Sequence, residues 1–229
     1  MIWLDDQLHL FPSPLDAPAD VDIIAIGGDL NPKRLLLAYS LGMFPWYNEG
    51  ETPILWQSPN PRFVLFPDQL RVNRSLRRSI KRSKYEFAID RDFNGVLQHC
   101  ASVKREGQDG TWLNPSLIQS LTELHTLGYA HSFEARLGEE LIAGLYGISI
   151  GGVFFGESMF TKQADASKIT FVLAAQALFK SGFKLIDCQA YTEHLERFGA
   201  MNLSRDIFHA LLREYTKRHP KFPHITHSV

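Results

Sequence analysis

The sequence predicts an α+β fold, in which helices flank a central, mixed and largely antiparallel β-sheet. Short apolar segments bounded by turn residues are typical of strands, and they alternate along the chain with longer segments whose apolar residues recur at helical spacing. The chain has 229 residues, of which 45% are hydrophobic and 21% charged, so a sizeable core is available.

The first part of the chain, residues 1–60, is rich in proline, glycine and tryptophan and contains one well-marked helix. Asn31 is a suitable N-cap, Pro32 occupies the first helical position, and the apolar residues that follow end at Gly42. The two prolines of the SPNPR segment then predict a stiff extended connector. We therefore expect a small N-terminal domain over 1–60 and a larger domain over 61–229.

The larger domain alternates strands and helices. Strands are expected over 62–66, 85–89, 130–137, 140–150, 152–160 and 184–189, and helices near 74–83, 92–101, 114–128 and 166–181, with further helices closing the chain. The turns LGEE and SIGG join three consecutive strands as hairpins. The centre of the sheet is therefore expected to be antiparallel.

Charge and cysteine content limit the classes of function. Twenty-four basic and 25 acidic residues give a net charge of −1, so an anionic partner must meet a local patch of cations. Cys100 and Cys188 make no disulfide framework, which suits a reducing cytoplasm. The chain starts without a secretory signal pattern and has no apolar stretch near the roughly 20 residues of a membrane helix. We expect a cytoplasmic monomer with no membrane partner.

A basic amphipathic helix follows the connector. Val72, Leu76 and Ile80 recur every four positions as a buried stripe, so the cations between them must cover the exposed surface. These cations are Arg74, Arg77, Arg78, Lys81 and Arg82. Hardly any acidic residue balances them, which favours a phosphate-backbone site over the alternative of an ordinary solvated surface. Such a site positions a nucleic acid without reading its sequence.

Two tryptophans lie in segments that read as loops. Trp46 follows a proline in MFPWY, and Trp112 follows a glycine in DGTWL. In such places an aromatic ring can cap the core, or it can stack on a nucleobase, a contact that contributes roughly 1–3 kcal/mol per base. Together with the basic helix, the two rings favour base stacking.

Glu157 interrupts a strand that is otherwise almost wholly apolar. In a regular strand, Phe155, Glu157 and Met159 share one face, so a carboxylate is expected among hydrophobic side chains. A buried glutamate must be paired or must change its pKa. The structural alternative is a salt bridge to Lys162 or Lys168.

Asp187 and Gln189 end the apolar strand KLIDCQ. Alternation puts both on one face and Cys188 on the other, so the polar pair is expected to point at one particular place. The alternative is an ordinary strand end that breaks into a loop. For Cys188, core packing is favoured over a nucleophilic role, because no histidine is its neighbour in sequence.

Seven segments of the chain, taken together and in order, resemble the leucyl/phenylalanyl-tRNA protein transferases. They are IGGDL, LGMFPWY, LWQSPNPR, GTWL, GLYGISIGGVFFGESMF, ASKI and LIDCQ, and they span roughly residues 24–200. The resemblance implies transfer of Leu or Phe, with Met as a further candidate, from aminoacyl-tRNA to the N-terminal Arg or Lys of acceptor proteins. Such transfer marks a protein for N-end rule degradation. It also implies a small N-terminal domain and a C-terminal domain similar to the GNAT acetyltransferases.

The resemblance also implies roles for individual residues. It places the family's catalytic pair on Asp187 and Gln189, its acidic residue on Glu157, the aromatics near the 3′-terminal adenosine on Trp46 and Trp112, and the tRNA acceptor arm on the basic helix. Phe155 and Met159 are expected to line the pocket for the donor side chain. No cofactor and no metal are expected, because the aminoacyl ester is already activated.

The chemistry of aminolysis leaves the proton acceptor open. An amide is too weakly basic to be the base, so Gln189 is expected to hydrogen-bond the amine or the carbonyl. Asp187 is expected either to orient Gln189 or to accept the proton through it or through a water. Glu157 is expected near a substrate ammonium.

Two other functions fit parts of the sequence. The first is an acyl-CoA-dependent N-acetyltransferase, whose pyrophosphate usually lies in a glycine-rich loop, whereas the corresponding segment TKQADAS has no glycine. The second is a tRNA-binding module without catalysis. In such a module Asp187, Gln189 and Glu157 would be idle polar groups in apolar strands, which is an unfavourable arrangement.

Overall fold

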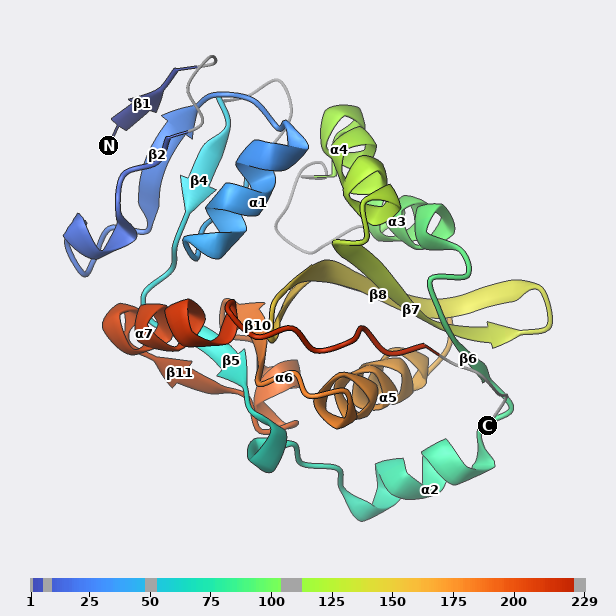
Figure 1. Cartoon of the computed structure of the whole chain (residues 1–229). Helices are drawn as coiled ribbons and strands as arrows, with labels where there is room; N and C mark the ends of the chain where they lie inside the picture. Colours follow the sequence, from blue (N-terminus) through green and yellow to red (C-terminus); the bar gives the residue numbers. More distant parts are fainter. Residues whose placement is uncertain (1, 6–9, 48–52, 104–112, 225–229) are drawn as a thin grey trace.

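The computed structural model describes residues 2–5, 10–47, 53–103 and 113–224. The strands form two β-sheets, and the helices pack around them (Figure 1). The predicted α+β class is confirmed. Within these ranges, no helix combines the length and the apolar character that crossing a membrane requires.

The smaller sheet comes from the first part of the chain and has the strand order β1-β2-β4-β3. Its strands are β1 (Ile2–Leu4), β2 (Ile23–Gly27), β3 (Phe44–Pro45) and β4 (Leu55–Gln57). Helix α1 (Pro32–Ser40) begins as expected, because the Asn31 side chain accepts a hydrogen bond from the Lys33 N–H at 2.9 Å. The helix buries Leu35 and Tyr39 against the rest of the molecule.

The larger sheet has seven strands in the order β11-β5-β10-β9-β8-β7-β6. They are β5 (Arg62–Leu65), β6 (Glu86–Ile89), β7 (Ala130–Leu137), β8 (Glu140–Ile150), β9 (Val153–Thr161), β10 (Leu185–Gln189) and β11 (Met201–Leu203). All neighbours are antiparallel except β9 and β10, which are parallel. We expected only helices at the end of the chain. The structure differs, because the edge strand β11 lies between the last two helices in sequence.

Helices cover both faces of the larger sheet (Figure 1). They are α2 (Arg74–Arg82), α3 (Phe93–Ser102), α4 (Pro115–Thr126), α5 (Ala166–Lys180), α6 (Glu193–Glu196) and α7 (Arg205–Tyr215), with short 3₁₀ turns at Pro14–Asp16 and Pro67–Gln69. One core joins the sheet to α1, α3, α4 and α7, and a second core joins its opposite face to α5 and α2. The sheet is thus the middle layer of three.

The two sheets meet at the proline-containing connector, and the N-terminal residues share the first core with the larger sheet. Arg205, at the start of α7, strengthens this junction. Its guanidinium donates hydrogen bonds to backbone carbonyl oxygens of Pro14, Ala17, Pro18, Val21 and Ser58 at 2.6–3.4 Å. One side chain of the C-terminal part therefore holds several turns of the N-terminal part in place.

Candidate functional site

A pocket opens where β9 and β10 separate. The two parallel strands pair for three residues, the last pair being Asp187 with Phe155. Past that point the strands diverge, and a pocket of about 420 Å³ lies between them and α5. We call it the β9/β10 pocket. Its apolar walls include Leu145, Phe154, Met159, Phe171, Leu178 and Ile186, and Trp46 reaches it from the N-terminal part.

A β-bulge in β9 aims Glu157 at this pocket. Tyr146 of β8 pairs with Ser158 and Gly147 pairs with Gly156, so Glu157 is the extra residue on its strand. A bulge reverses the alternation of side chains beyond it.

The expectation that Phe155, Glu157 and Met159 share a face is therefore wrong for Met159, which packs against the opposite core. Phe155 and Glu157 both face Tyr39 of α1: the Phe155 ring lies 5.3 Å from the Tyr39 ring, and the Tyr39 hydroxyl hydrogen-bonds to Glu157. Phe155 is fully buried there and is not part of the pocket wall. Phe154 occupies the wall instead, while Met159 lines the pocket as expected.

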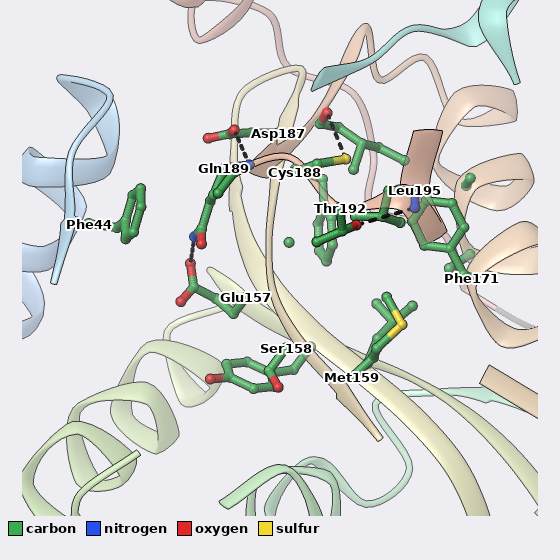
Figure 2. A pocket seen from close by; sticks show the side chains of 18 of the residues that line it. Phe44, Glu157, Ser158, Met159, Phe171, Asp187, Cys188, Gln189, Thr192 and Leu195 are labelled. Carbon is green, nitrogen blue, oxygen red and sulfur yellow. Dashed lines mark hydrogen bonds between the residues drawn. The ribbon is translucent and has the colours of Figure 1, made fainter. Parts of the chain in front are cut away.

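A second bulge, in β10, sets the conformation of Gln189. The register of β10 against β5 shifts between Asp187 and Gln189, and Gln189 has a φ of 64°, in the left-handed region. The Asp187 carboxylate accepts the backbone N–H of Gln189 at 2.9 Å and so supports this conformation. The Gln189 side chain then donates to Glu157 Oε1 at 2.6 Å, as Figure 2 shows. The three polar residues that the sequence pointed to lie together at the pocket.

Asp187 is an ion-paired carboxylate. Arg62 Nε and Nη2 donate to its two oxygens at 2.8 and 2.6 Å, and both side chains are completely buried. The guanidinium carbon of Arg62 lies 4.9 Å from the ring centre of Phe44 and 4.7 Å from that of Phe208. Arg62 was not predicted as a site residue. An arginine at the start of an apolar strand is a usable signal, because a buried guanidinium needs an acidic partner.

Glu157 has an environment that favours its neutral form. Burial is the largest influence and raises the pKa of Glu157 from its ordinary 4.5 to about 7. The hydrogen bond from the Tyr39 hydroxyl lowers the pKa, the negative charge of Asp187 raises it, and Gln189 and Arg62 lower it. Glu157 is thus divided between its acid and carboxylate forms near neutral pH.

The salt-bridge alternative for Glu157 does not describe this structure. Lys162 lies 3.8 Å from Glu140, and Lys168 lies 2.6 Å from Asp165, so both lysines have other carboxylate partners. The polar contacts of Glu157 come instead from Tyr39 and Gln189, as described above.

Cys188 also lines the pocket, and it packs in the core beneath α5. Burial, followed by the charge of Asp187, raises the pKa of the Cys188 thiol far above its usual range. The thiolate that a nucleophile needs is therefore scarce at neutral pH. Among the residues that the structure describes, no three His, Cys, Asp or Glu side chains gather into a group that could hold a metal ion.

The basic helix is α2, and its predicted stripe is present. Leu76 is buried, and Val72 and Ile80 pack against the same core. The five predicted cations are exposed, and none of the ion pairs formed between described residues involves them. Two of them, Arg78 and Arg82, border a groove beside the start of α5. Trp112 lies outside the described residues.

Solved structures that this chain partly resembles include a GCN5-related N-acetyltransferase from Kribbella flavida and L-PGS from Bacillus licheniformis. The first is 13% identical with a TM-score of 0.39, covering 74% of this chain and 60% of that one. The second is 13% identical with a TM-score of 0.44, covering 87% of this chain and 64% of that one.

The family model of the leucyl/phenylalanyl-tRNA protein transferase matches residues 64–213 of this chain. The model of the N-terminal domain of the same transferase matches residues 28–60. A leucyl/phenylalanyl-tRNA-protein transferase of Anaeromyxobacter sp. (strain Fw109-5) is 54% identical over 88% of this chain and 85% of its own. A protein of the same name from Myxococcus xanthus is 51% identical over 93% of this chain and 90% of its own. Another, from Chromobacterium violaceum, is 50% identical over 96% of this chain and 93% of its own. The chain therefore belongs to the leucyl/phenylalanyl-tRNA protein transferase family.

Proposed function

We propose that the protein transfers Leu or Phe from aminoacyl-tRNA to the N-terminal Arg or Lys of acceptor proteins in the cytoplasm, which marks them for N-end rule degradation. One observation carries the proposal within the family: an apolar pocket with Glu157, Gln189 and Asp187 gathered where β9 and β10 separate. The donor side chain occupies the pocket, and its ester carbonyl lies at the polar residues. Met159 suits both guests because a methionine side chain adapts to aliphatic and aromatic shapes.

Glu157 is the proton acceptor in this proposal. The attacking α-amine has a reference pKa of about 7.7–8.0, and a base near that value transfers protons most effectively. A pKa of about 7 gives Glu157 this property. Gln189 donates to Glu157 and fixes where the amine and the ester meet, which is worth roughly 7–11 kcal/mol when two reactants are well positioned.

Asp187 acts by positioning. Because Arg62 holds both of its oxygens, Asp187 is a poor proton acceptor and instead fixes the backbone of Gln189. Of the two roles that the sequence left open for Asp187, the orienting one is therefore the role we propose.

The tRNA meets the protein at two places in this proposal. Trp46, which lines the pocket, stacks on the 3′-terminal adenosine, and Trp112 is proposed for the same end of the tRNA. The exposed cations of α2 meet the phosphates of the acceptor arm. They lie on a different element from the polar residues of the pocket, so binding and chemistry can be separated by mutation.

The acetyltransferase alternative is disfavoured by the start of α5. Asp165 occupies the N-cap of this helix, at the position where an acetyltransferase of this kind would hold pyrophosphate. A carboxylate there repels a second anion, although Lys168 partly neutralises it. A tRNA-binding module without catalysis does not need a buried glutamate, whose burial is unfavourable and raises its pKa to about 7.

The proposed function is tested by incubating the purified protein with radiolabelled leucyl-tRNA and a peptide that begins with Arg. An N-acetylated copy of the peptide is the matched control, and acetyl-CoA replaces the donor in a second control. We expect label to move only to the peptide with a free amine. Tight tRNA binding without transfer would favour the binding module, and acetylation of the peptide would favour the acetyltransferase.

Removing two cations from α2 is expected to weaken tRNA binding without slowing turnover at saturating tRNA. In the double variant Arg77→Ala/Lys81→Ala, each lost phosphate contact reduces the slope of log affinity against log salt by about 0.7–0.9. Filter binding over a salt series measures the slope. The control is Lys180→Ala, an exposed lysine at the C-terminal end of α5. An unchanged salt slope in the double variant would show that α2 is only a solvated surface.

A further inference from the structure

The chain continues past α7 as an extended segment, drawn in red in Figure 1, which we call the C-terminal strap (residues 216–224). Its start is fitted closely to the turn between β8 and β9. The Gly152 N–H donates to the Tyr215 carbonyl oxygen at 2.8 Å, and a Cβ on Gly151 would lie 2.3 Å from the carbonyl oxygen of Thr216. The strap then passes the end of α5, where Pro220 lies against Gly182.

Phe222 anchors the strap in the core beneath α5. Its ring centre lies 3.4 Å from that of His131, with the two planes 11° apart, so the rings stack face to face. His131 is itself held on both sides, with Nδ1 2.7 Å from Asp90 Oδ2 and Nε2 3.1 Å from the Gly128 carbonyl oxygen. Phe222 therefore rests on a ring that cannot easily turn away.

Phe222 also lies close to three further aromatic residues, one of which lines the β9/β10 pocket. Its ring centre lies 6.4 Å from Phe154 and 5.8 Å from both Phe133 and Phe183. Phe154 is a wall residue of the pocket and is 1% exposed. It lies three residues before Glu157, which is about 10 Å along a strand. Phe222 thus packs near a residue of the pocket wall without lining the pocket itself.

We propose that Phe222 is a specificity-determining residue that sets the depth of the β9/β10 pocket by holding Phe154 in place. This inference rests on the proposed function. Phe222 does not line the pocket and touches no substrate, so it acts through Phe154. Without the ring, the space behind Phe154 lets the wall retreat, and the deeper pocket favours the longer Phe side chain over Leu.

The test compares Phe222→Ala with the unmodified protein, using leucyl-tRNA and phenylalanyl-tRNA as donors to the same Arg peptide. The readout is the ratio of kcat/KM for Phe to kcat/KM for Leu. We expect the ratio to rise roughly 3- to 10-fold. A direct pocket contact of one methylene discriminates between substrates by about 10- to 200-fold, and Phe222 acts only indirectly, through Phe154. Leu121→Ala is the control, since it truncates an apolar side chain of the other core, which does not line the pocket.

Each outcome bears on the inference. A ratio that rises in Phe222→Ala and not in Leu121→Ala supports it, whereas an unchanged ratio, or an equal change in both variants, overturns it. If Phe222→Ala does not fold, Phe222→Leu decides by the same ratio with a smaller expected rise. Failure of the unmodified protein to transfer either amino acid would instead overturn the proposed function, so the two failures are distinguishable.

Discussion

Replacing Glu157 by Gln is expected to lower the turnover of the transfer reaction by about 10²- to 10⁴-fold, the range that general acid and base catalysis contributes. Gln keeps the shape of the side chain and can still accept the hydrogen bond from Gln189, but it cannot take a proton at neutral pH. Single-turnover rates at saturating leucyl-tRNA measure the effect. Binding of tRNA is expected to stay unchanged, because the cations proposed to bind it lie on α2.

The pH dependence of the same variant identifies the base. A base with a pKa of about 7 is active above that pH, so the unmodified enzyme loses rate as pH falls through 7. Ionisation of the attacking amine, near about 7.7–8.0, adds a second step. In Glu157→Gln we expect the lower step to vanish and the amine step to remain. A variant that kept both steps would rule out Glu157 as the proton acceptor.

The raised pKa of Glu157 also predicts a gain in stability for Glu157→Gln. The folded state holds a proton that the unfolded state releases, so the native glutamate destabilises the fold progressively as pH rises from 4.5 to about 7. The shift corresponds to at most about 3 kcal/mol at pH 8. Urea unfolding at pH 4.5 and pH 8 measures it, with the exposed Glu140→Gln as control. A variant that gained no stability at pH 8 would contradict the environment described for Glu157.

Replacing Arg62 by Met is expected to destabilise the fold by about 3–5 kcal/mol, because it leaves the Asp187 carboxylate buried without a partner. Met fills much of the space between Phe44 and Phe208, so the effect reports the lost charge more than lost volume. Urea unfolding at neutral pH measures the loss. The variant is also expected to be inactive, because Asp187 no longer holds Gln189.

A double variant separates the two consequences of losing Arg62. When Asp187→Leu is added to Arg62→Met, no buried charge remains, and most of the stability is expected to return. Activity is expected to stay low, because the backbone N–H of Gln189 has lost its acceptor. If the double variant regained activity with its stability, Asp187 would have no positioning role.

The sequence predicted those parts of the molecule that depend on local patterns. Asn31 caps α1 where expected, because an N-cap is decided by a few neighbouring residues. The apolar stripe of α2 followed from helical spacing alone. The meeting of Glu157 with Gln189 could be foreseen in part, since polar residues in apolar strands must find partners.

The sequence predicted less where tertiary contacts decide. The expectation of one shared face for Phe155, Glu157 and Met159 failed because alternation assumes a regular strand, and the bulge at Glu157 turns Met159 to the opposite core. The pair of Arg62 and Asp187 joins residues 125 positions apart, so no local pattern contains it. The strap was not predicted because its prolines and polar residues show no helical or strand pattern, although Phe222 packs against the core.

The hydrogen bonds of Arg205 have a consequence for how the molecule unfolds. They tie turns before residue 22 and the connector at Ser58 to the first residue of α7, across 147 to 191 positions of chain. The smaller sheet cannot come away while α7 stays in place without leaving these buried groups unpaired. Melting is therefore expected to be one cooperative event, and the N-terminal region serves as part of the catalytic body and not as a detachable module.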